Sequence, residues 1–362
     1  MLRDDDQIGP GQALAVIGTF TLGLNAAVLP RLAARAGADA WLAFLAATLA
    51  GMAAALLLGA VTRRFPNQTF VEYGSSLLGP FLGRLVAGLL VLFWLLILSV
   101  AVRQFGDIVK LYLLQRTPLE VVLLSLLFVA GYAARGGIEP LARANQIALP
   151  AVMLPALATF LATLFSADWT RFLPVLDKGV APLLRPTLDL AVQYAGLESL
   201  LVYGAFMDQP RAGTRVAFWA VLLTFLLGTA TILGTIGNMG ATETSRLLWP
   251  SLALLGAVQL PSLFLERVTG VILALWTALI AGATAVGLNL IGTTLARLSG
   301  QRGARIYIFP ATLAVFLLAI LPINVTQAMA WMRALVPFTA AVLWGLPILF
   351  LLLAGRRRGK SA

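Results

Sequence analysis

Long apolar stretches alternate with short polar segments along most of the chain. A helix needs about 20 apolar residues to cross about 30 Å of hydrocarbon. Stretches of about this length predict ten transmembrane helices, at residues 9–34, 39–61, 83–113, 118–134, 141–166, 183–207, 214–236, 263–294, 307–324 and 331–354. The pattern therefore predicts an all-α integral membrane protein.

No soluble domain or linker separates these stretches, so residues 1–362 are expected to form a single transmembrane domain. Five predicted helices fall in a first half, about 8–166, and five in a second half, about 183–354. The longest piece between predicted helices, 237–262, is itself apolar and is expected to lie against the helices as a lid.

Composition supports the membrane interpretation, because 60% of the residues are hydrophobic and only 11% are charged. A soluble fold of 362 residues has too little interior to bury so much apolar surface. The net charge of +11 would suggest nucleic-acid binding only if the basic residues formed a stripe on a soluble domain. They are scattered between apolar stretches, so no nucleic-acid partner is expected.

The chain contains no Cys and no His. It therefore has no disulfide, thiolate nucleophile, zinc–thiolate site or imidazole base. No nucleophile–base pair or metal-ligand cluster is visible, so we expect neither an enzyme nor a protein with a cofactor or metal.

Orientation follows from the Lys and Arg residues near the ends of the predicted helices, which favour the cytoplasmic side. With the N-terminus inside, 15 of the 26 Lys and Arg residues fall in cytoplasmic segments, including the tail Arg356 to Lys360. An even number of spans then places both termini in the cytoplasm.

Two predicted helices contain residues that favour a break in mid-membrane. The first contains Gly18, Gly23 and Asn25, which are poor helix formers, and the sixth contains Gly196 beside Glu198 and other polar residues. Irregular backbone persists in lipid only where protein or a cavity satisfies it, so a break in each half indicates a binding site. Alternatively, the glycines serve close helix packing.

Ionisable residues inside the membrane are costly and are candidates for function. Glu198 lies near the middle of the sixth predicted helix, and Arg103 and Asp107 lie one turn apart in the third. The alternatives are a neutral Glu198 hydrogen-bonded between helices and an i,i+4 ion pair near the outer interface. Asp189, one turn outside Gln193, is expected to line a vestibule.

Several of these stretches resemble those of a known family. The chain resembles the B subunit of spore germinant receptors, the endospore germination permeases of the amino acid–polyamine–organocation superfamily. The resemblance rests on the order and spacing of Leu22-Gly23 with Val28–Arg31, Gly136–Glu139 with Arg143, Leu173–Leu176, Gly196–Glu198, and Leu248–Pro250 leading to Phe264–Arg267.

The resemblance implies a ten-helix LeuT-like fold of two inverted five-helix repeats, with helices 1 and 6 broken. It implies a protein that senses small germinants, usually amino acids. The expected location is the spore inner membrane or the cell membrane of a spore-forming bacterium. Expected partners are the A and C receptor subunits and the lipid bilayer. Where the family commonly has Gly-x-Gly, this chain has Gly23-Leu24-Asn25, so the identity of the germinant does not transfer.

The ligand-binding hypothesis concerns the two candidate breaks. N–H groups near Gly23 and Asn25 would hold a ligand carboxylate, and carbonyls near Tyr194 and Gly196, with Glu198, would receive its ammonium group. The candidate ligand-binding residues are Thr19, Thr21, Gly23, Asn25, Tyr194, Gly196 and Glu198, and the candidates for coupling or gating are Arg103, Asp107, Gln193 and Glu198. The alternative function is an autonomous proton-coupled amino acid transporter that uses Glu198.

Overall fold

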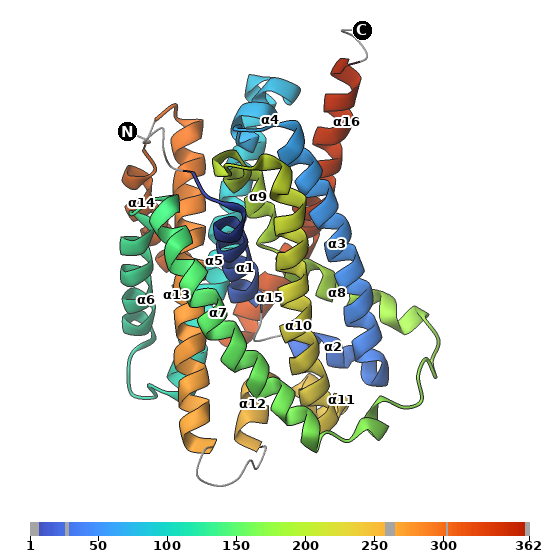
Figure 1. Ribbon diagram of the computed structural model, residues 1–362. Helices are drawn as coiled ribbons and strands as arrows, with labels where there is room; N and C mark the ends of the chain where they lie inside the picture. Colours follow the sequence, from blue (N-terminus) through green and yellow to red (C-terminus); the bar gives the residue numbers. More distant parts are fainter. Residues whose placement is uncertain (1–6, 26–28, 258–264, 302, 359–362) are drawn as a thin grey trace.

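The computed structural model describes residues 7–25, 29–257, 265–301 and 303–358, with only the backbone described at 25, 256–257, 265–269 and 356–358. These residues form helices joined by short turns, and one isolated β-bridge links Ile8 to Met207 (Figure 1). In lipid, a helix satisfies every backbone N–H and C=O within its own segment, so apolar stretches fold this way.

The described part of the N-terminal half contains nine helical elements. They are α1 (Pro10–Asn25), α2 (Leu29–Ala33), the 3₁₀ helix η1 (Ala34–Asp39), α3 (Ala40–Arg64), α4 (Phe70–Leu78), α5 (Pro80–Tyr112), α6 (Leu119–Ala134), α7 (Ile138–Ala162) and η2 (Thr163–Ser166).

The C-terminal half is more divided. It contains η3 (Trp169–Phe172), η4 (Ala181–Leu183), α8 (Leu184–Ala191), η5 (Val192–Tyr194), η6 (Leu197–Ser199), α9 (Leu200–Tyr203), η7 (Gly204–Phe206), η8 (Pro210–Ala212), α10 (Gly213–Met239), α11 (Ala241–Arg246), α12 (Pro250–Ala257), α13 (Leu265–Leu298), α14 (Arg305–Ile320), α15 (Val325–Ala340), the π-helical turn η9 (Ala341–Gly345) and α16 (Leu346–Arg358).

Six helical stretches in the described residues are long and apolar enough to cross a bilayer unaided. They are Leu29–Arg64, Pro80–Tyr112, Ile138–Ser166, Pro210–Met239, Gly270–Leu298 and Val325–Gly355. Three shorter apolar helices, Pro10–Leu24, Leu119–Ala134 and Arg305–Ile320, overlap further predicted spans. The all-helical membrane class is confirmed, and the count of ten spans stays a prediction.

The core surrounds α1, which packs against α7, α10 and α13 and carries fully buried Ile17 and Phe20. Beside it, α3 and α10 run next to each other (Figure 1). Large apolar side chains also cover the outside of the bundle: Phe128 is 77% exposed and Tyr132 is 79% exposed. An outer surface of this kind is typical of helices that face lipid.

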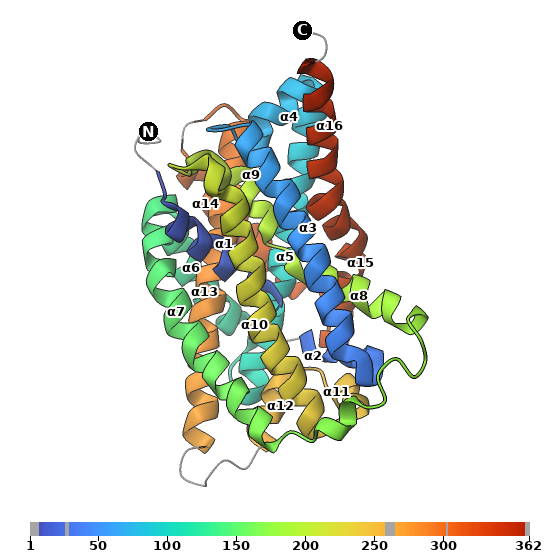
Figure 2. The same ribbon diagram turned by 45° about the vertical axis from the view of Figure 1, so that its right-hand side comes forward.

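The predicted apolar lid at 237–262 forms the end of α10 and two short helices, as far as the structure describes it. Of these, α12 packs against α10 and α13. Figure 2 shows α11 and α12 at the end of the bundle opposite α4 and the last turns of α16. They therefore cover one end of the helices.

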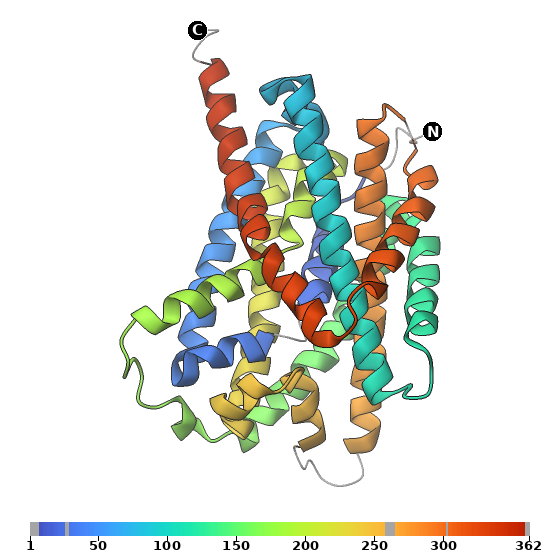
Figure 3. The same ribbon diagram turned by 180° about the vertical axis from the view of Figure 1, so that it is seen from behind.

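The last long stretch is bent. It contains Pro337 inside α15 and a π-helical turn between α15 and α16, where the helix changes direction (Figure 3). Proline and π-turns are recognised causes of helix kinks. Trp344 on the turn donates its indole N–H to the Ala50 carbonyl over 3.1 Å, which ties the bend to α3.

Candidate functional site

The segment predicted as the sixth span is interrupted in its middle. Helical geometry ends at Tyr194, Ala195 adopts φ −52° and ψ 139°, and Gly196 adopts φ 112° before η6 begins. A positive φ of this size suits glycine, because a Cβ would collide with the neighbouring backbone. The backbone therefore leaves helical geometry at Ala195 and Gly196, and we refer to this departure as the interruption.

The interruption is satisfied by buried side chains. Glu198 is fully buried and accepts hydrogen bonds from the Gly196 N–H at 2.6 Å and from the Trp94 indole N–H at 3.2 Å. Ser199 donates its hydroxyl to the Gly196 carbonyl over 2.5 Å. Because unpaired backbone groups are costly in a water-free interior, these contacts hold the interruption in place.

Tyr194, on the other side of the interruption, is also fully buried. Its hydroxyl lies 2.7 Å from the Thr48 hydroxyl of α3, with either group able to donate. Its ring lies beside Gly51, where a Cβ would approach ring carbons to 2.9 Å. Tyr194 thus fastens this segment to α3.

The first predicted span, 9–34, contains α1 up to Asn25 and α2 from Leu29, and any break between them lies outside the described residues. Gly18 and Gly23 lie inside α1, which stays helical to Asn25, and the side chain of Asn25 lies outside the described residues. A Cβ on Gly23 would overlap that of Ala283 in α13, so Gly23 permits close helix packing. The N–H groups that follow Asn25 lie outside the described residues, so the proposed contact between a ligand carboxylate and N–H groups near Gly23 and Asn25 stays a prediction.

The two segments meet at Thr21. A Cβ on Gly196 would lie 2.6 Å from the Thr21 Cα, so the interruption rests directly on the backbone of α1. The Thr21 hydroxyl donates to the Ile17 carbonyl over 2.8 Å. Thr19 is buried and its hydroxyl has no hydrogen-bond partner among the described residues. Both Thr19 and Asn145 of α7 lie against Gly282 of α13.

A cleft opens on one side of these segments. Its walls come from the end of α1, α2 with η1, α5, α8 with η5, and α15. Its polar lining consists of Arg35, Gln104, Asp189, Gln193, Arg333 and Thr339. Both signs of charge therefore face a largely apolar cleft.

An ion pair lies at the cleft. The Arg35 guanidinium and the Asp189 carboxylate are 3.1 Å apart and partly exposed, at 40% and 23% of their side-chain surfaces. Asp189, which was predicted to line a vestibule, lines this cleft. Arg35, Gln104 and Arg333 were not among the predicted site residues. The signal for Gln104 was its spacing with Ile97 and Val100, which places all three on one face of α5.

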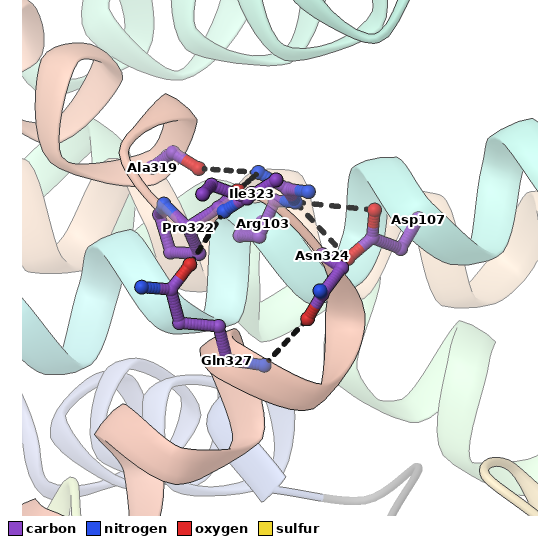
Figure 4. Close-up of polar contacts among 7 residues, drawn as sticks. All are labelled: Arg103, Asp107, Ala319, Pro322, Ile323, Asn324 and Gln327. Atoms are coloured by element: carbon purple, nitrogen blue, oxygen red, sulfur yellow. Dashed lines mark hydrogen bonds and ion pairs between the residues drawn. The ribbon is translucent and has the colours of Figure 1, made fainter.

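Arg103 and Asp107 do not line this cleft. They form the i,i+4 ion pair at 3.1 Å, and the Arg103 guanidinium also donates to the carbonyls of Ala319 at 3.2 Å and Pro322 at 2.5 Å (Figure 4). Those carbonyls belong to the end of α14 and the turn before α15. The pair therefore joins α5 to the start of the bent helix that walls the cleft.

We expect Glu198→Gln to destabilise the protein by about 1–3 kcal/mol, because one of the two N–H donors loses its buried acceptor. A thermal unfolding scan of the purified protein would measure this. Glu139→Gln on the exposed end of α7 is the control and should leave the unfolding temperature nearly unchanged. Equal unfolding temperatures for the two variants would contradict the conclusion that Glu198 holds the interruption in place.

Comparisons with known proteins agree with the helical membrane fold described above. A family model described as spore germination protein matches residues 7–328. The chain belongs to the spore germination permease family. It is 24% identical to spore germination protein YndE of Bacillus subtilis (strain 168) over 287 residues, which cover 76% of this chain and 77% of that protein. It is 27% identical to spore germination protein B2 of the same organism over 281 residues, covering 77% and 76%.

Solved structures show the fold of this family member. It is similar to the crystal structure of MhsT in complex with L-phenylalanine, with a TM-score of 0.70, 16% identity and coverage of 95% of this chain and 94% of that chain. It is also similar to Mhp1, a nucleobase-cation-symport-1 family transporter, with a TM-score of 0.65, 12% identity and coverage of 93% and 77%. These are LeuT-fold transporters. The germination permease is thus a multi-pass membrane protein of permease-like fold, and its family is not an enzyme class.

Proposed function

We propose that this permease is the germinant-sensing B subunit of a spore germination receptor. It binds a small amino-acid-type ligand in the cleft between α1, α5, the interrupted segment and α15. Binding favours one of two conformations, and this change signals to the A and C subunits. A ligand can drive such a shift only by its difference in affinity for the two states.

The observation that carries the proposal is the pairing of opposite charges in the cleft. Arg35 and Asp189 face each other at 3.1 Å, and Arg333 lines the same space. A zwitterionic amino acid carries one carboxylate and one ammonium group, so it can replace both halves of this pair. The apolar part of the lining is left for a side chain.

The finer architecture is part of the proposal. Ten spans arranged as two inverted five-helix repeats, with interruptions in the first and sixth, would place this cleft near the bilayer midplane. Both termini then face the cytoplasm, as the distribution of Lys and Arg suggests. The solved MhsT structure contains L-phenylalanine, which supports an amino acid as the class of ligand.

We expect Arg35→Ala to weaken amino acid binding at least about tenfold, which corresponds to about 1.4 kcal/mol for one lost charge-assisted contact. Isotope-binding assays on the purified protein with a panel of L-amino acids would measure the affinity. Arg116→Ala removes an exposed charge just after α5 and is the matched control. If no amino acid binds, or if both variants bind equally well, the cleft assignment is wrong.

Glu198 lies outside the lining of the cleft, and its carboxyl accepts hydrogen bonds from Gly196 and Trp94. This favours a positioning role for Glu198 over proton exchange with the ligand.

An assay of amino acid uptake into proteoliposomes distinguishes sensing from proton-coupled transport. Binding without uptake is the expected result. Concentrative uptake driven by a pH gradient, by this chain alone, would favour the transporter.

A further inference from the structure

A second cavity is lined by residues of α1, α2, α7, α10, α12 and α13. The last four of these helices do not line the cleft. Its lining contains apolar side chains such as Val152, Met153 and Leu275, and no charged residue in the part of the chain that the structure describes. The cavity is therefore unsuited to the zwitterion proposed for the cleft, because burying unpaired charges is costly.

The polar side-chain groups of the described lining are the Trp276 indole N–H and four hydroxyl groups. Three of the hydroxyls bond to the backbone of their own helices: Thr21 to Ile17, Thr224 to Ala220 and Thr231 to Gly228, over 2.8, 3.0 and 2.9 Å. The fourth is different. Ser251, in the first turn of α12, is only 5% exposed, and its hydroxyl has no hydrogen-bond partner among the described residues.

We propose that this cavity is a binding site for a neutral, mainly apolar molecule with one hydroxyl or carbonyl group. Mostly apolar pockets with a few placed polar groups are typical small-molecule sites. The apolar walls supply affinity, and the Ser251 hydroxyl pairs with the single polar group of the ligand. A buried hydroxyl without a partner costs free energy that such a ligand recovers.

The position of the cavity gives its occupant a way to affect the cleft. Thr21 lines the cavity, and the interruption at Gly196 rests on the Thr21 backbone. An occupant that moves this part of α1 would therefore also move the segment that carries Asp189 and Gln193. In this way the cavity would modulate ligand binding in the cleft while remaining a separate site.

The test is photolabelling of the purified full-length protein with 3-azioctanol, a photoreactive neutral alcohol. We expect saturable labelling of the cavity residues Val152, Met153 and Phe160, and little labelling of Leu154, which faces outward on the same helix. Excess 1-octanol should abolish the labelling, and L-alanine should not. Labelling distributed evenly over outward-facing residues, or without saturation, would overturn the proposal.

Variants of the lining make the test specific. Ala156→Phe fills the cavity and should reduce saturable labelling at least about tenfold, whereas Ala158→Phe points outward and should leave it unchanged. Ser251→Ala should weaken competition by 1-octanol about threefold to tenfold, as expected for one hydrogen bond, and leave competition by octane unchanged. Undiminished labelling of Ala156→Phe would refute the site, and an unaltered 1-octanol affinity in Ser251→Ala would refute the role of Ser251. None of these readouts depends on amino acid binding in the cleft.

Discussion

Gly196→Ala is expected to destabilise the permease by about 2–6 kcal/mol and to abolish ligand binding. Two costs add at this position. The backbone has φ 112°, and a residue with a side chain held in such a region costs about 1–3 kcal/mol. The new Cβ would also lie 2.6 Å from the Thr21 Cα, and overpacking of this kind costs about 1–3 kcal/mol more. Denaturant titration and thermal unfolding of the purified variant would measure the loss.

Substitutions at two other glycines distinguish the cost of backbone strain from the cost of overpacking. Gly79 has φ 89°, and a Cβ added there would meet nothing within 4 Å, so Gly79→Ala introduces backbone strain alone. Gly88 lies inside α5 with open space around it, so Gly88→Ala introduces neither cost and should be neutral or slightly stabilising. The expected order of stability is Gly88→Ala, then Gly79→Ala, then Gly196→Ala. Gly196→Ala as stable as Gly88→Ala would contradict the interruption of the helix at Gly196.

The helices themselves were predictable from the apolar pattern. The predicted span 118–134 corresponds to α6 at Leu119–Ala134, and 214–236 corresponds to α10 at Gly213–Met239. The reason is that lipid offers backbone groups no alternative partner, so a sufficiently long apolar segment must be helical. Packing against other helices can therefore do little to change the helical conformation of such a segment.

The roles of individual glycines were less predictable. Gly23 and Gly196 both lie in apolar segments beside polar residues, yet Gly23 is helical and Gly196 is not. Gly23 is needed for its contact with Ala283 of a distant helix, and Gly196 is needed for both its φ angle and its contact with α1. The sequence shows only which residues flank each glycine along the chain. The roles of Gly23 and Gly196 differ because different residues lie next to them in the folded protein.

The cleft was partly predictable for a similar reason. Gln193 was a candidate because a polar residue in mid-span is unusual, and it lines the cleft. Arg35 follows the end of a predicted span, where charges are common, and nothing in the sequence separates it from an interfacial residue. Arg103 and Gln104 are adjacent, but successive residues on a helix point about 100° apart. Arg103 therefore contacts the end of α14, while the Gln104 amide lies 3.4 Å from the sulfur of Met332 in α15.

Arg103→Ala is expected to destabilise the permease by about 3–5 kcal/mol, the usual cost of removing one partner from a buried ion pair. The Arg103 side chain is 6% exposed and that of Asp107 is 10% exposed. The substitution leaves the carboxylate without its cation, and the carbonyls of Ala319 and Pro322 without a donor. Because these carbonyls precede α15, which walls the cleft, ligand affinity should fall together with stability. Unfolding titrations and the isotope-binding assay would measure both.

The chain offers a matched control for this prediction. Arg143 forms an ion pair with Glu139 of the same i,i+4 spacing, but with 67% of its side chain exposed. Pairs of that kind contribute about 0.3–0.5 kcal/mol, so Arg143→Ala should have little effect. In the double variant Arg103→Leu with Asp107→Leu, no charge is left unpaired, and part of the lost stability should return. If Arg103→Ala were no worse than Arg143→Ala, Arg103 would not hold α14 and α15 to α5. If the double variant were no more stable than Arg103→Ala, the bonds to Ala319 and Pro322, and not the stranded carboxylate, would account for the loss.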